Sequence, residues 1–246
     1  MNPLLLPATR IEYRYRALFL VASQPVLAWL MTRFGGVEGN WIAPRIATEW
    51  AIAGSVLGVL GVWIRIQAAS YLSSTKIAQP DAMTDEIVQT GPFGSVRNPL
   101  YLGSLLLFTG FAMTLGWQAA SLYFLFHLIR YQRVVMREEE LLKSEWGRRY
   151  DAYCQAVPRW FPRNMFALFS GSRWTGEAIL GNCPFIGLAA GIIGGIWTGD
   201  LMPVLAGETL GFVIAGVFFM SRAASPDARA AAVDSATESP DLAVKP

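Results

Sequence analysis

Charged residues are scarce in this sequence. Only 15% of the 246 residues are Asp, Glu, Lys or Arg, whereas soluble domains typically carry about 25%. Hydrophobic residues make up 53% of the chain, and the formal net charge is only +2. This composition argues against the main alternative, a large soluble α-helical core. It also gives no reason to expect a nucleic-acid partner.

Cysteine and histidine are rarer still. Cys154 and Cys183 lie far apart and have no CxxC or other metal-ligand spacing, so we expect neither a metal site nor a disulfide. The single histidine, His127, lies within an apolar block. It can serve as a ligand or a base, but a hydrogen bond to a neighbouring helix is the commoner role. A glycine-rich dinucleotide-binding fingerprint is also absent, which excludes that mode of cofactor binding.

What the sequence does contain is a series of apolar blocks that are nearly free of charge. The longer blocks approach the roughly 20 residues that a membrane-spanning helix requires. Two shorter ones flank "GWQ" at 116–118 and predict a helical hairpin that does not fully cross. We therefore predict an all-α integral membrane protein with about six transmembrane helices, including this short hairpin. The blocks are Leu18–Met31, Ile46–Ile64, Leu100–Leu115, Ala119–Ile129, Ile179–Trp197 and Val204–Met220.

Basic residues predict the orientation of the chain. Arg10, Arg14 and Arg16 precede the first block, and the basic segment Arg130–Arg173 follows the fourth. The positive-inside rule places both on the cytoplasmic side, with both termini, in the inner membrane if the cell is bacterial. The basic excess also indicates contact with anionic membrane lipids. We expect no cleavable signal peptide.

Two segments just outside the apolar blocks carry the polar residues of interest. In "TDEIVQTGPFGSVRNPLYLG", the glycines and Pro92 predict a turn, and Asn98-Pro99 predicts a helix start. The unpaired N–H groups of a helix start can hold a ligand's carboxylate or hydroxyls. The second segment, Arg130–Pro162, continues the fourth block as a helix.

The helical period places four side chains from the end of the fourth block and from this second segment on the same side of the helix. His127, Tyr131, Val134 and Glu138 fall on one face. The neighbouring charges around Glu138–Glu140 are, on periodicity alone, typical of a solvated face with local ion pairs. Elsewhere, Arg65 lies near the end of the second block, where snorkelling to the membrane surface explains it.

Together the two segments resemble the isoprenylcysteine carboxyl methyltransferase and phospholipid methyltransferase superfamily of membrane enzymes. That family carries a pattern close to "LVTSGPYxxVRHPxYxG", then, after a hairpin, "EExxLxxxFGxxYxxYxxxVPRWIP". This chain reads "EIVQTGPFGSVRNPLYLG" and "EELLKSEWGRRYDAYCQAVPRWFP". The likeness covers roughly residues 77–163, about a third of the chain.

The resemblance implies a single membrane-embedded methyltransferase domain over residues 1–222, with its motif core at about 77–163 and a disordered tail at 223–246. It implies a cofactor cleft at the cytosolic face that binds S-adenosylmethionine and releases S-adenosylhomocysteine. Carried over position by position, the expected cofactor-binding residues are Glu86, Ile87, Val88, Phe93, Asn98, Pro99, Leu100, Tyr101 and Glu138.

Two departures from the family pattern concern the chemistry. Asn98 stands where the family usually has histidine, and asparagine cannot titrate near neutral pH. Val134 stands where the prenylcysteine branch has an arginine one turn before the acidic residue. Arg133 is next to it, so we expect Arg133 to be the catalytic residue that binds an acceptor carboxylate, with Arg130 as the alternative.

The methyl acceptor stays open at this stage. An isoprenylcysteine-type carboxylate, or another lipid or prenylated small molecule, is one class, and a phospholipid amine is the other. A membrane reductase that uses NADPH is a different function, because some such enzymes resemble this family in their C-terminal helices. A non-enzymatic transporter or scaffold is the third hypothesis. The sequence leaves the oligomeric state undetermined.

Overall fold

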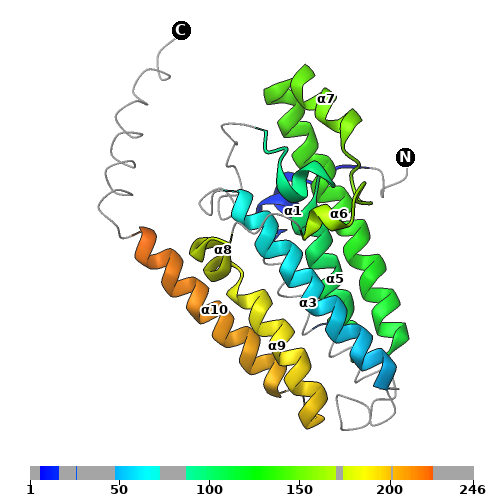
Figure 1. Cartoon of the computed structure of the whole chain (residues 1–246), viewed down its shortest axis with the longest axis vertical. Coiled ribbons are helices and arrows are strands. Elements are labelled where there is room, and N and C mark those ends of the chain that lie inside the picture. Colours follow the sequence, from blue (N-terminus) through cyan, green and yellow to red (C-terminus); the bar gives the residue numbers. More distant parts are fainter. Residues whose placement is uncertain are drawn as a thin grey trace.

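The computed structural model describes residues 6–16, 26, 48–72, 87–169, 174–200 and 202–223. All regular structure in this part of the chain is helical, which confirms the predicted all-α class. Five long helices lie side by side (Figure 1). They are α3 (Thr48–Tyr71), α5 (Pro99–Met113), α6 (Trp117–Trp146), α9 (Cys183–Thr198) and α10 (Met202–Ala223).

Short helices gather at one end of these long helices, which we call the motif end (Figure 1). At this end α3 finishes, α5 begins and α6 continues beyond the other helices into α7. The short elements are α1 (Arg10–Arg14), α7 (Arg148–Ala156), α8 (Gly176–Gly181) and the 3-10 turns η2 (Gly91–Gly94) and η3 (Phe166–Leu168).

Two of the described helices are long and apolar enough to cross a membrane. These spans are Glu49–Tyr71 and Met202–Arg222, while Pro99–Met113 and Cys183–Thr198 are shorter apolar helices. The predicted block Leu18–Met31 lies outside the described residues except for Val26, as does the predicted tail from residue 224 onward. The number of six spans therefore stays a prediction.

The predicted helical hairpin is present as α5 and α6. Helix α5 begins at Pro99, directly after Asn98, as the sequence predicts. The chain turns at Gly116, whose φ of 112° suits glycine because it has no side chain, and α6 begins at Trp117. Helix α6 is apolar in its first half and charged in its second half. Its length brings the second motif segment back to the motif end.

Glycines allow α3 and α5 to pack in close antiparallel contact. A Cβ atom at Gly61 would lie 2.4 Å from the carbonyl oxygen of Gly103, and one at Gly110 would lie 2.3 Å from that of Gly54. Backbones that approach this closely gain van der Waals contact without needing a hydrophobic driving force in lipid. These glycines therefore fix the position of α5 on α3.

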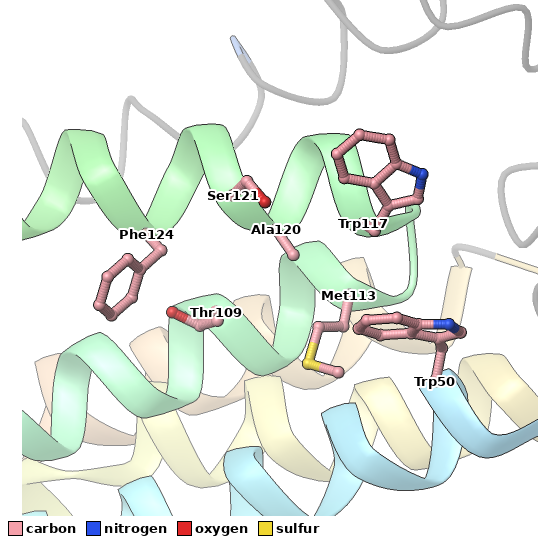
Figure 2. Close-up of a pocket in the computed structure, with 7 residues that line it drawn as sticks. All are labelled: Trp50, Thr109, Met113, Trp117, Ala120, Ser121 and Phe124. Carbon is pink, nitrogen blue, oxygen red and sulfur yellow. The ribbon is translucent and has the colours of Figure 1, made fainter.

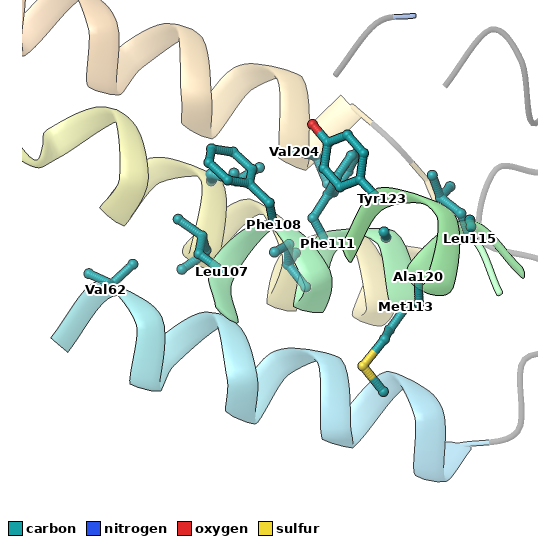
Figure 3. Close-up of a cluster of buried hydrophobic side chains, with 14 of the residues drawn as sticks. Val62, Leu107, Phe108, Phe111, Met113, Leu115, Ala120, Tyr123 and Val204 are labelled. Atoms are coloured by element: carbon teal, nitrogen blue, oxygen red, sulfur yellow. The ribbon is translucent and has the colours of Figure 1, made fainter. Parts of the chain in front are cut away.

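A core of buried side chains fills the space between α3, α5, α6 and the α9–α10 pair. Figure 3 shows Phe108, Phe111 and Tyr123 among its members, with Val62 of α3 at one margin and a contribution from α10 at Val204. Leu107, Phe108 and Ala112 have no exposed surface. Because the same core anchors both helices of the hairpin, it holds the start of α5 and the outer half of α6 in fixed relation.

We expect Gly61→Ala to lower the stability of the protein in detergent. A methyl group at this site meets backbone atoms, which cannot move aside, so the cost is about 1–3 kcal/mol. Gly216→Ala on α10 is the matched control, because a Cβ atom there meets nothing within 4 Å. The measurement is the thermal unfolding midpoint of the two variants. A Gly61→Ala protein that unfolds at the wild-type temperature contradicts the close packing of α3 and α5.

Candidate functional site

The two motif segments, separated by about sixty residues, lie against each other at the motif end. The backbone N–H of Arg97 donates to the carbonyl of Pro158 at 2.9 Å, and that of Arg163 donates to the carbonyl of Ser95 at 3.0 Å. The Asn98 side-chain amide donates to the carbonyl of Arg159 at 3.3 Å. Residues 95–98 and 158–163 therefore form one unit beneath which α5 begins.

Glu139 joins this unit to α6. Its carboxylate accepts two hydrogen bonds from Arg159, one of them from Nε at 3.0 Å, and lies 3.1 Å from Nη1 of Arg97. The side chains of Glu139 and Arg97 are each only 12% exposed. The expected solvated face thus describes Glu140, which pairs with Arg137 on the surface at 3.3 Å, but is wrong for Glu139.

Helix α7 supports the first motif from the other side. The Tyr153 hydroxyl donates to the carbonyl of Phe93 in η2 at 2.7 Å. Tyr150, Tyr153 and Val157 form a small buried cluster against which Ile87 packs. Burial raises the pKa of Tyr153, so its hydroxyl stays protonated and available as a donor.

Glu138 faces a different direction, toward the start of α5. The Tyr101 hydroxyl donates to its Oε1 at 2.6 Å, and Nε of Arg16 lies 3.8 Å from the same oxygen. Burial raises the pKa of Glu138, while the hydrogen bond from Tyr101 and the charge of Arg16 act in the opposite direction. Carboxylate, phenol and guanidinium groups thus meet at the motif end, between the first turn of α5 and the charged half of α6.

Helix α1 brings Arg16 to this point by docking on α6. Thr9 caps α1 and forms a reciprocal pair of hydrogen bonds with Glu12. Glu12 pairs with Arg133 at 2.8 Å, and the N–H of Ala8 donates to the carbonyl of Arg133 at 2.8 Å. Arg133, the predicted catalytic residue, therefore lies in an ion pair that fastens α1 to α6.

Sequence reasoning missed Arg16 and Tyr13 as site residues. The Arg16 guanidinium lies 4.4 Å from the centre of the Tyr13 ring, and both residues contact the Tyr101–Glu138 pair. The available signal was the density of arginine and tyrosine in "RIEYRYR". We read that segment only as an orientation signal because nothing local places it beside α6.

Most of the predicted cofactor-binding residues lie near one another. Tyr101 and Glu138 are hydrogen-bonded, and Asn98, Pro99 and Leu100 lead directly into Tyr101. The remaining ones are more scattered: Phe93 lies in η2, Ile87 packs on the α7 cluster, Val88 is partly buried, and Glu86 is outside the described residues. Their role in holding a cofactor stays a prediction.

Arg65 does not snorkel as the sequence suggested. Its Nε donates to Oδ1 of Asn182 at 3.1 Å, and its Nη1 donates to the Leu100 carbonyl at 3.2 Å and to Ser104. The guanidinium also stacks on Phe185, 3.5 Å from the ring centre. Arg65 therefore points into the bundle and joins α3 to α5 and α9.

An apolar cavity lies at the other end of the hairpin, away from the motif end. It has a volume of about 410 Å³ and lies among α3, α5 and α6. Figure 2 shows the rings of Trp50, Trp117 and Phe124 around it, with Met113 between them. Nothing charged lines it, so it is suited to hydrocarbon rather than to a polar cofactor.

Metal-ligating side chains do not cluster in the part of the chain that the structure describes. No group of three or more His, Cys, Asp or Glu residues comes together there. Cys154 and Cys183 are both free thiols.

Three curated relatives match part of the chain. The cobalt-zinc-cadmium resistance protein CzcN of Cupriavidus metallidurans is 30% identical over 156 residues, covering 61% of this chain and 64% of the relative. The nickel-cobalt-cadmium resistance protein NccN of Alcaligenes xylosoxydans xylosoxydans is 29% identical over 148 residues, covering 58% and 62%. The chain thus spans less than two thirds of the length of either relative.

The third relative has a different name. The Delta(14)-sterol reductase LBR of Gallus gallus is 27% identical over 129 residues, which cover 46% of this chain and 20% of the relative. No solved structure matches the chain.

A family model matches the middle of the chain. It is the model of phospholipid methyltransferase, and the match covers residues 50–149. This range contains all but the first two residues of α3, the α5–α6 hairpin, the Tyr101–Glu138 pair and the first motif. The segment 50–149 belongs to the phospholipid methyltransferase family, within the superfamily of membrane methyltransferases that the two sequence motifs indicated.

Proposed function

We propose that this protein transfers a methyl group from S-adenosylmethionine to a lipid-like acceptor at the cytosolic face of a membrane. One observation carries the proposal: the 2.6 Å hydrogen bond between Tyr101 and Glu138 lies where the two family motifs meet. The family match over residues 50–149 supports it, because that range supplies both residues.

The side chains at this point fit the cofactor. S-adenosylmethionine presents an ammonium, a carboxylate and ribose hydroxyls. The Glu138 carboxylate suits the ammonium or a ribose hydroxyl, and the Arg16 guanidinium beside it suits the carboxylate. The N–H groups in the first turn of α5, at Leu100 and Tyr101, add donors of the kind that helix starts offer. Phe93 lies apart from this point, in η2, and is the expected aromatic neighbour of the adenine.

We infer that the preferred reaction is methylation of a carboxylate, of the isoprenylcysteine type. Methyl transfer from a sulfonium to a carboxylate forms a C–O bond while the C–S bond breaks, leaves the electron pair on sulfur and moves no proton. The protein then has to align the two reactants and exclude water, since a dry site favours a reaction that neutralises opposite charges. These tasks suit a site in which Asn98 cannot act as a base.

A phospholipid amine is the alternative acceptor, and it must lose a proton before it can react. His127 is poorly placed to take that proton, because it lies eleven residues before Glu138, about 16 Å along α6. It is fully buried and stacks on Phe108 with 5.3 Å between ring centres. Among the residues at the motif end, this leaves Glu138 as the candidate base for an amine.

The match to a sterol reductase supports a second function, reduction with NADPH. The two functions differ in the cofactor that stabilises the folded protein. A ligand that binds only the folded state raises the unfolding temperature by mass action. Adenosylhomocysteine, but not NADPH, is expected to raise it here; the reverse result favours the reductase.

Removing the Tyr101–Glu138 pair is expected to weaken adenosylhomocysteine binding. We expect Tyr101→Phe and Glu138→Gln each to raise Kd at least about tenfold, or about 1.4 kcal/mol. Glu140→Gln is the matched control, because Glu140 is exposed and its pair with Arg137 lies on the surface, away from Tyr101. Titration calorimetry in detergent measures all four proteins. A well-folded wild type that binds no adenosylhomocysteine removes the methyltransferase proposal.

Cofactor affinity is expected to fall as the pH is lowered. Burial raises the pKa of Glu138 above its ordinary value of 4.5, so the carboxylate that binds the ligand is lost at a higher pH than for an exposed glutamate. Calorimetry from about pH 8 down to about pH 5 follows this loss. Glu138→Gln should bind weakly with little pH dependence. A wild-type profile as flat as that of the variant contradicts the role of Glu138.

The acceptor class is expected to show in a direct methylation assay. Purified protein receives methyl-labelled S-adenosylmethionine with either an S-farnesyl thioether carboxylate or phosphatidylethanolamine vesicles. We expect label on the carboxylate as a base-labile ester, because the site needs no base for that reaction. Label on phosphatidylethanolamine alone overturns the carboxylate preference and supports the amine.

A further inference from the structure

Below the Tyr101–Glu138 pair, toward the membrane, lies a second polar layer that the proposed function does not yet use. It contains Arg65 of α3, Ser104 of α5, and Arg130 and Tyr131 of α6. Tyr131 precedes Glu138 by seven residues, about 10 Å along α6, and lies on the same face. Its ring lies 5.2 Å from that of Tyr101, so the two layers are in contact.

The positive charges of this layer have no counterion among the residues that the structure describes. Arg133 pairs with Glu12, Arg16 with Glu138, and Arg97 with Glu139, but no described carboxylate pairs with Arg65 or Arg130. The described bonds of Arg65 come from Nε and Nη1, and Arg130 gives Nη2 to the carbonyl of Arg16. Burying cations without an anion in a low-dielectric bundle is costly.

Two buried donors in this layer also lack a well-placed acceptor among the described residues. Nη1 of Arg130 and the hydroxyl of Tyr131 make no hydrogen bond of ordinary geometry to any described residue. Tyr131 is only 1% exposed, and its hydroxyl lies among Ser104, Arg65 and Arg130. An unsatisfied buried donor costs about 1–3 kcal/mol, so both groups favour a ligand that brings acceptor oxygens.

Deeper along the hairpin the surroundings change from polar to aromatic and then to apolar. His127 contacts Tyr123 with 4.3 Å between ring centres and stacks on Phe108. Beyond them lies the apolar cavity beside Trp117 and Phe124 (Figure 2). The order of layers matches a lipid with a charged group at one end and hydrocarbon at the other.

We propose that Arg130 and Tyr131, with Arg65 opposite, bind an anionic oxygen group of the lipid-like acceptor. The proposal rests on the proposed methyl transfer and names the recognition group that it requires. In this proposal Arg130 takes the role that the sequence suggested for Arg133, because the ion pair with Glu12 already neutralises Arg133. The anionic group is either the carboxylate that becomes methylated or the phosphodiester beside a reacting amine, and both present the same acceptor oxygens to the two donors.

Tyr131→Phe is the sharpest test, because it removes only the hydroxyl, which lies near Ser104 and Arg130 but makes no hydrogen bond of ordinary geometry to a described residue. Folding is therefore expected to be preserved. Arg130→Gln removes the unpaired charge, and Arg133→Gln is the matched control from the next turn of the same helix. Each variant is first checked for adenosylhomocysteine affinity. Tyr131→Phe should stay within about twofold of wild type, since Tyr101, Glu138 and Arg16 keep their contacts, whereas Arg130→Gln and Arg133→Gln lose a contact with the segment that carries Arg16 and are expected to bind it less tightly.

Three probes then distinguish the sources of the anion. They are an S-farnesyl thioether carboxylate, its uncharged methyl ester, and phosphatidylethanolamine in detergent micelles. Equilibrium binding to the wild type should favour one of the two anionic probes over the ester. Tyr131→Phe and Arg130→Gln should each weaken that probe at least about tenfold and leave the ester unaffected, whereas Arg133→Gln should bind as wild type does.

Several results would overturn the proposal. These are an unchanged affinity for the anionic probe in Tyr131→Phe and Arg130→Gln, an equal loss in Arg133→Gln, or a wild type that binds the ester as tightly as both anionic probes. Failure of methyl transfer gives a different signature. In that case the anionic probe binds through Arg130 and Tyr131, but adenosylhomocysteine does not bind at all.

Discussion

The ion pairs around Glu139 hold the candidate site together. Arg97 comes from the first motif and Arg159 from the second, and both point at one carboxylate on α6. Removing one partner of a buried pair leaves an uncompensated charge and typically costs about 3–5 kcal/mol, although a well-packed apolar replacement of the whole group need not. The network is therefore best understood as a positioning device, which fixes three distant segments in a single arrangement.

That arrangement determines where the adjacent glutamate points. Successive residues on a helix are separated by about 100°, so Glu139 cannot face the two arginines without turning Glu138 toward another neighbour. That neighbour is Tyr101, which the α3–α5 packing and the common core place at the start of the hairpin. Of the two adjacent glutamates, Glu139 thus holds the motif segments together, and Glu138 faces the point at which we propose that the ligand binds.

The features that the sequence predicted correctly are those with local causes. The start of α5 at Pro99, the break at Gly116 and the common face of α6 that carries His127 and Tyr131 follow from proline, glycine and helical period. The features that it missed depend on contacts between distant segments. Arg65 looked like a snorkelling residue because its partner Asn182 is 117 positions away. The pair of Arg133 with Glu12 likewise joins residues 121 positions apart, and nothing in the helix around Arg133 reveals it.

The distribution of counterions separates the arginines into two groups with different consequences. Arg97, Arg133 and Arg159 have carboxylate partners, and each joins one segment of the chain to another. An arginine that is already neutralised can accept a substrate anion only by giving up that partner, which weakens both the fold and the binding. Arg130 has no such cost, because its described contacts are to a carbonyl and an aromatic ring. A charged acceptor, as proposed, is therefore bound at the lowest cost in free energy in the layer below Glu138, where the buried arginines have no counterion among the described residues.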